Sequence, residues 1–97
     1  MKAMHVTLDR SVPFKEAEDT LRLARLAVES IYGAERTEFE VQVEIDRDAR
    51  LFIIDVTRRV GRTLALVFAG YARREFGPDT VLVEHVAPQR QLAVETA

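Results

Sequence analysis

Two long segments with a helical period dominate this chain of 97 residues, and short alternating segments lie between and around them. In residues 14–32 and 60–76 the apolar positions recur about every 3.6 residues, which is typical of helices with one buried face. Gly33 follows the first segment and Gly77-Pro78 follows the second, and both are common stop signals of helices. The sequence therefore predicts two helices of similar length, each of which needs an apolar surface to cover.

Four segments in which apolar and polar residues alternate are predicted to be the strands that provide this surface. They cover residues 4–9, 38–46, 51–57 and 80–86. The second and third are expected to form a hairpin whose apolar side chains share one face, which leaves residues 47–50 as a four-residue loop. The residue pairs that then lie opposite each other are Val43 and Ile54, Val41 and Val56, and Glu38 and Arg59.

The order of these elements is strand, helix, strand, strand, helix, strand. With right-handed crossovers, this order predicts an α+β domain with the ferredoxin-like βαββαβ fold, in which a four-stranded antiparallel sheet carries two helices on one face. The main alternative treats the weak first or last strand as a loop and leaves three strands under two helices. Residues 1–87 are expected to form this single domain, and residues 88–97 a flexible C-terminal tail.

The composition excludes several classes of protein. The chain has no cysteine, which rules out disulfide scaffolds, thiolate metal sites and cysteine nucleophiles. Its formal net charge of −2 gives no general attraction to nucleic acid or to anionic lipid, so nucleic-acid binding is not expected. The longest uncharged apolar run covers residues 64–72 and is much shorter than the roughly 20 residues that span a membrane. The N-terminus lacks the features of a secretory signal, and a cytoplasmic protein without a membrane partner is predicted.

No motif of a known reaction is found in the sequence. Ser11 and Ser30 do not lie in a nucleophile elbow, and no glycine-rich phosphate loop occurs. A histidine and three carboxylates are expected on the sheet face away from the helices, where such groups can hold a divalent metal. These residues are His5, Asp9, Asp55 and Glu84. Solvated side chains on an exposed face are the simpler interpretation, so no cofactor or metal is predicted, and catalysis is not expected.

The second helix carries more apolar surface than one contact with a sheet requires. Large apolar residues follow one stripe along it and small residues follow the adjacent stripe, and together they span roughly 200° at about 100° per residue. Small residues allow another backbone to approach closely, either the first helix within the fold or a second subunit. Leu66 lies off both stripes and favours a second subunit. The predicted interface consists of Gly61, Ala65, Leu66, Ala69 and Ala72.

The resulting hypothesis for the function is a non-catalytic interaction or assembly module that forms a homodimer or binds another protein. The alternative is a dimeric α+β barrel-type enzyme or a small-ligand-binding domain, with a pocket on the open sheet face lined by His5, Asp55 and Tyr71. A basic cluster at the start of the second helix is a candidate anion-binding site, because the free N–H groups of a helix N-terminus also attract anions. Its members are Arg58, Arg59 and Arg62, although solvated charge is the simpler interpretation.

Overall fold

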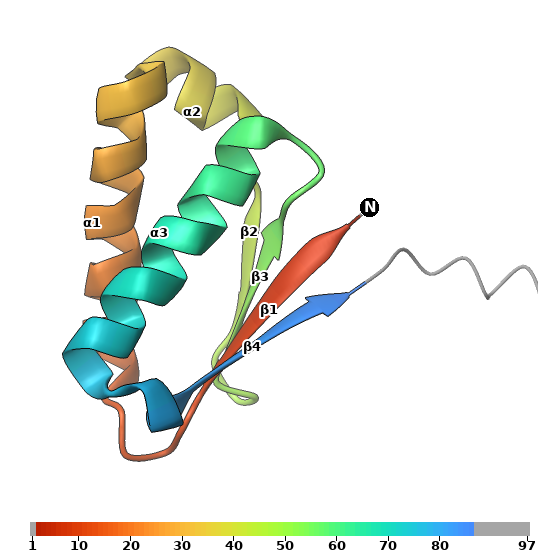
Figure 1. Ribbon diagram of the computed structural model, residues 1–97. Helices are drawn as coiled ribbons and strands as arrows, with labels where there is room; N and C mark the ends of the chain where they lie inside the picture. The colour runs from red at the N-terminus through yellow and green to blue at the C-terminus, as the bar shows by residue number, and fades with distance from the viewer. Residues whose placement is uncertain (1, 87–97) are drawn as a thin grey trace, which may run out of the picture.

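The computed structural model describes residues 2–86, in which helices cover one side of a four-stranded antiparallel sheet (Figure 1). The elements in chain order are β1 (Ala3–Leu8), α1 (Phe14–Tyr32), α2 (Ala34–Glu40), β2 (Val43–Asp46), β3 (Leu51–Asp55), α3 (Arg59–Phe76), the 3-10 helix η1 (Pro78–Thr80) and β4 (Val81–Val86). The predicted α+β class and four-stranded antiparallel sheet are confirmed. The three-stranded alternative is wrong, because β1 pairs with β4 at every position of β1. The predicted tail, residues 88–97, lies outside the described residues.

The strand order of the sheet is β2-β3-β1-β4, so β1 and β3 are central and β2 and β4 form the edges. The predicted pairing of Val43 with Ile54 is confirmed, and so is the loop of residues 47–50. On the other side of the sheet, β1 places Met4 opposite His85 of β4. Met4 is buried under the helices, and paired residues share a face, so His85 also lies on the helix-facing side.

The first half of the second predicted strand is wrong, because α2 occupies this part of the chain and β2 begins only at Val43. The cause is local. Thr37 is fully buried, and its hydroxyl donates a hydrogen bond of 2.8 Å to the Gly33 carbonyl one helical turn earlier. The alanine, glutamate and arginine residues of α2 also favour a helix over a strand. Phe39, which the alternation places on the buried face, is 79% exposed.

The two residue pairs predicted for the outer part of the hairpin are wrong for the same reason. The ladder between β2 and β3 begins with Val43, so it does not include Val41 opposite Val56. Glu38 lies on α2 and does not face Arg59 across a sheet. Its carboxylate instead accepts a hydrogen bond of 2.9 Å from Arg25 of α1, which ties the two helices together.

Three aromatic rings join the helices to the sheet at the centre of the core. Phe14 of α1 stacks on Phe52 of β3 with the ring centres 5.0 Å apart. Phe52 also meets Phe68 of α3 in an edge-to-face contact at 4.9 Å. Phe52 and Phe68 are fully buried, so this chain of rings connects α1, the sheet and α3.

The small residues of α3 are used inside the fold. A side chain added at Gly61 would place its Cβ 2.2 Å from the Asp55 carbonyl oxygen, which shows how closely α3 approaches the end of β3. Of the two contacts expected for the small-residue stripe, the one within the fold is present, and Leu66 is the member of the predicted interface that stays exposed. The buried members are Gly61, Ala65, Ala69 and Ala72.

The turn between β1 and α1 is organised by the Asp9 carboxylate, which accepts hydrogen bonds from the Ser11 hydroxyl at 2.6 Å and from the Ser11 N–H at 2.9 Å. The hydroxyl bond is the main cause that lowers the pKa of Asp9 below its ordinary value. This pKa is lower in the folded than in the unfolded chain, so the interaction stabilises the fold above the unfolded-state pKa and is lost as pH falls through the folded-state pKa. We expect Ser11→Ala to raise the pKa of Asp9, as measured by NMR titration of its carboxyl carbon, and Ser30→Ala to leave it unchanged. An unaltered pKa in Ser11→Ala would contradict this assignment.

Candidate functional site

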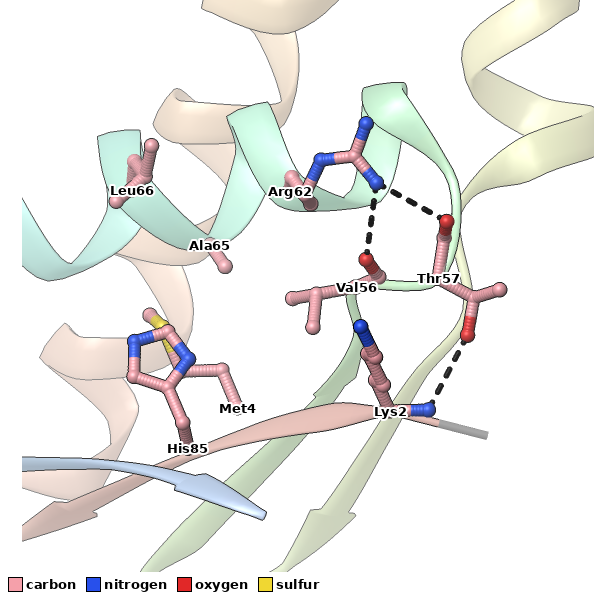
Figure 2. Close-up of a pocket in the computed structure, with 8 residues that line it drawn as sticks. All are labelled: Lys2, Met4, Val56, Thr57, Arg62, Ala65, Leu66 and His85. Carbon is pink, nitrogen blue, oxygen red and sulfur yellow. Dashed lines mark hydrogen bonds between the residues drawn. The ribbon is translucent and has the colours of Figure 1, made fainter. Parts of the chain in front are cut away.

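A cavity lies between α3 and the sheet, at the end where β1 begins and β4 ends (Figure 2). Its volume of about 520 Å³ is in the range of natural small-ligand sites. The lining residues come from the start of the chain, from the segment between β3 and α3, from α3 itself and from β4. They are Lys2, Met4, Val56, Thr57, Arg62, Ala65, Leu66 and His85.

The cavity forms because α3 and β4 diverge. The helix-facing residues of β4 become more accessible along the strand: Val81 is 4% exposed, Val83 is half-buried and His85 is exposed. Figure 1 shows the end of β4 lying apart from the first turns of α3. Ala65, which lies on α3 above this region, is too small to fill the space (Figure 2).

The floor of the cavity is apolar. Met4, Val56 and Ala65 are all buried in the fold and present carbon and sulfur atoms to the cavity. Leu66 lies at the rim and is 66% exposed. A ligand that covered Leu66 would remove apolar surface from water, which is favourable by about 25 cal/mol per Å², whereas Met4 and Ala65 are already shielded from water by the fold.

Two cationic side chains, those of Lys2 and Arg62, and the imidazole of His85 surround this floor. Arg62 Nη1 donates hydrogen bonds to the carbonyl oxygens of Thr57 at 3.0 Å and Val56 at 3.4 Å, which hold the guanidinium at the mouth of the cavity (Figure 2). The Lys2 backbone N–H donates to the Thr57 hydroxyl at 3.2 Å and fixes the start of the chain beside it. None of the described residues that line the cavity is acidic. An entering anion would therefore meet positive charge from several directions.

Acidic and basic side chains lie on different surfaces around the cavity. The open face of the sheet, away from the helices, carries the carboxylates of Glu44, Asp46, Asp55 and Glu84. The outer surface of α3 and the residue before it carry exposed arginines. These are Arg58, Arg59, Arg62, Arg73 and Arg74.

The predicted anion-binding cluster is only partly brought to the cavity. Arg62 lines it, whereas Arg58 and Arg59 are exposed at the start of α3 and do not. The reason is the position of each arginine at the start of α3. Arg62 lies one turn into α3 and turns back to the carbonyl groups of the preceding segment.

The residues of the predicted pocket, His5, Asp55 and Tyr71, are not brought together within one copy of the chain, because the sheet lies between Tyr71 and the other two. His5 and Asp55 lie on the open face, whereas Tyr71 belongs to α3 and lines a shallow hollow beside Leu23 of α1. His5 faces Glu84 across β1 and β4. Residues 2–86 contain no group of three histidine or acidic residues placed to hold a metal ion.

Sequence reasoning did not find Lys2, Met4 or His85 as site residues. For His85, the sequence did not decide which of the two alternating sets of β4 side chains faces the helices. Charge could have decided between them, because burying Glu84 costs more than burying His85. The set that contains His85 is the one that faces the helices.

Within the described part of the chain, residues 2–86, no helix has the length and apolar character that crossing a membrane requires. Comparisons with protein-family models, with curated proteins and with solved structures found no match to this chain, so the chemistry of the cavity itself has to indicate the function.

Proposed function

We propose that this chain is a non-catalytic binding module that holds a negatively charged ligand with an apolar body in the cavity beneath α3. The observation that carries the proposal is the combination of two cationic side chains and a histidine with an apolar floor in one cavity that has no acidic residue in its described lining. Charged groups around a largely apolar concave surface are the usual composition of a ligand site.

Each part of the ligand has a counterpart in the cavity. An anionic group near Lys2 and Arg62 would form charge-assisted hydrogen bonds, which are stronger than neutral ones. The apolar body would cover Leu66 at the rim and lie against the floor formed by Met4 and Val56. A bare inorganic anion leaves Leu66 in contact with water, and a neutral apolar molecule leaves the cations without a partner.

A binding role is favoured over catalysis by the surroundings of His85. A catalytic histidine is commonly oriented by a carboxylate, and the described lining of the cavity contains none. We also propose that the fold is a ferredoxin-like βαββαβ unit with α2 added between α1 and β2, which the strand order β2-β3-β1-β4 supports. The module is expected to act in the cytoplasm.

Self-association is the weaker candidate. Of the interface predicted on α3, Leu66 remains exposed, and it lies at the rim of the cavity. Packing two open sheet faces together would bring Glu44, Asp55 and Glu84 near the same carboxylates of a second copy, and burying such charges without partners is costly. We therefore favour ligand binding over homodimer formation.

The proposal is tested by NMR titration of the ¹⁵N-labelled chain with octanoate, and with octanol and octyltrimethylammonium as probes with the same apolar chain. We expect octanoate to shift the amide signals of residues that line the cavity, octanol to bind more weakly, and the cationic probe to give no saturable shift. Arg62→Gln should weaken octanoate binding about tenfold or more, because a hydrogen bond to a charged group contributes about 1.5–3 kcal/mol.

The matched control is Arg73→Gln, which removes the same charge from an exposed position of the same helix outside the cavity. Its affinity for octanoate should stay close to that of the unaltered chain. His85→Gln is a second cavity variant whose side chain does not hold the segment before α3. Equal binding of the three probes, or equal losses in Arg62→Gln and Arg73→Gln, would overturn the proposal.

A further inference from the structure

From the proposed function, on which this step rests, we infer that the natural ligand is an extended segment of another polypeptide that adds to the outer edge of β4 and places an acidic side chain beside His85, facing Lys2 and Arg62 across the cavity. The backbone of the segment pairs with β4, and its acidic residue supplies the anion. Addition of a strand to an exposed sheet edge is a common mode of peptide recognition, in which adjacent pockets select the side chains.

The two edges of the sheet differ in their protection against pairing with another chain. β2 is four residues long, and two of them, Glu44 and Asp46, are acidic. β4 is six residues long, contains neither proline nor lysine, and carries its one acidic side chain, Glu84, on the open face. Exposed edges are normally short, charged or interrupted by proline, because their unpaired backbone groups otherwise recruit a further strand. Within residues 2–86 only β1 pairs with β4, which leaves its outer edge available.

The strand with this unprotected edge contributes one residue to the cavity. His85 belongs to β4 and also lines the cavity. Neighbouring strands lie about 4.8 Å apart, and alternate side chains of a strand face the same side of the sheet. A strand added to β4 therefore places one side chain next to His85 at the mouth of the cavity and another beside Val83. Leu82, which is 57% exposed on the open face, contacts the side chains in between.

Charge distinguishes an acidic segment from a second copy of this chain. Two copies paired through β4 about a twofold axis would each keep a cavity with two cationic side chains and no acidic residue in its described lining. An acidic residue of another polypeptide neutralises these cations. A free amphiphile also neutralises the cations, but it leaves the edge of β4 unpaired.

The test uses a capped six-residue peptide that alternates valine and threonine and carries glutamate at one central position, added to the ¹⁵N-labelled full chain. One matched peptide has glutamine in place of glutamate. Two others carry N-methyl groups on one or the other alternate set of backbone nitrogens, so that only one of them loses the donors that face β4. We expect the glutamate peptide to bind, the glutamine peptide to bind about tenfold more weakly, and one methylated peptide to lose much more affinity than the other.

Amide hydrogen exchange gives a second readout. The glutamate peptide should slow exchange within Val81–Val86, because a new strand covers the outward-facing amides, whereas octanoate should not. Equal affinity of the two methylated peptides, together with unchanged exchange in β4, would exclude strand addition.

The outcomes also separate this inference from the proposed function. If octanoate binds in the cavity and the glutamate peptide does not, the ligand is a free amphiphile and the inference fails while the proposed function stands. If neither probe binds, both fail. If the free chain sediments as a dimer that the peptide dissociates, the edge belongs to a second copy and the inference is overturned.

Discussion

Gly61→Ala is expected to lower the free energy of unfolding by about 2 kcal/mol, although alanine is the better helix former by about 1 kcal/mol. The added methyl group would lie 2.2 Å from the Asp55 carbonyl oxygen. This neighbour belongs to the backbone, so it cannot move aside as a flexible side chain can, and α3 has to shift away from the end of β3. Urea unfolding followed by circular dichroism measures the loss.

Gly70→Ala is the matched control, because it makes the same substitution nine residues later in the same helix. A Cβ at Gly70 meets nothing within 4 Å, and the residue is exposed. Only helix propensity then acts, and we expect the free energy of unfolding to rise by about 0.5–1 kcal/mol. Changes of the same sign in the two variants would contradict the close approach of α3 to β3.

Phe52→Ala is expected to cost about 3–5 kcal/mol, the largest effect of a single side chain in this fold. Phe52 is fully buried and contacts Phe14 and Phe68 at the same time, so its removal leaves a cavity between α1, the sheet and α3. Domains of this size are commonly stable by about 5–15 kcal/mol, and the loss is a large share of that. The measurement is again urea unfolding.

Two further variants keep this prediction testable if Phe52→Ala does not fold. Phe52→Leu retains most of the volume and should cost about 1–1.5 kcal/mol. Phe39→Ala removes the same ring from a position that is 79% exposed, and its effect should stay within about 0.5 kcal/mol. A large loss of unfolding free energy in Phe39→Ala would indicate that Phe39 is buried in a strand, and it would contradict the assignment of α2.

The sequence predicted an element correctly where its periodic pattern agreed with a second constraint, such as a stop signal or the need for one apolar face. The first helix was predicted over residues 14–32, and the structure gives Phe14–Tyr32 before Gly33. The pairing of Val43 with Ile54 was predicted because one face of the hairpin had to be apolar. In both cases local pattern and burial indicate the same structure.

Prediction failed at α2 because two local signals disagreed there. The spacing of Phe39 and Val41 imitates a buried strand, but the residues around Thr37 favour a helix, and the Thr37 hydroxyl bonds to the Gly33 carbonyl. A side chain that fits an alternating pattern is not thereby buried, and the exposed Phe39 shows this directly.

The candidate site was less accessible to sequence reasoning than the fold. Arg62 was singled out for its place near a helix N-terminus, yet it matters because the cavity lies beside it. A cavity is a region where packing is incomplete, and this one depends on the divergence of α3 from β4. No local pattern describes the distance between two elements, so Lys2 and His85 could not be joined to Arg62 without the structure.

The open sheet face and the outer surface of α3 carry charges of opposite sign. The carboxylates of the open sheet face and the arginines along α3 lie on opposite sides of the fold, so the net charge of −2 does not describe the local field at either surface. An anion that approaches the sheet is repelled, and one that approaches α3 is drawn toward the cavity. Salt shortens the range of this field from about 30 Å at 0.01 M to about 8 Å at 0.15 M. The speed at which an anionic partner is captured therefore depends on ionic strength, even where the contacts formed after capture do not.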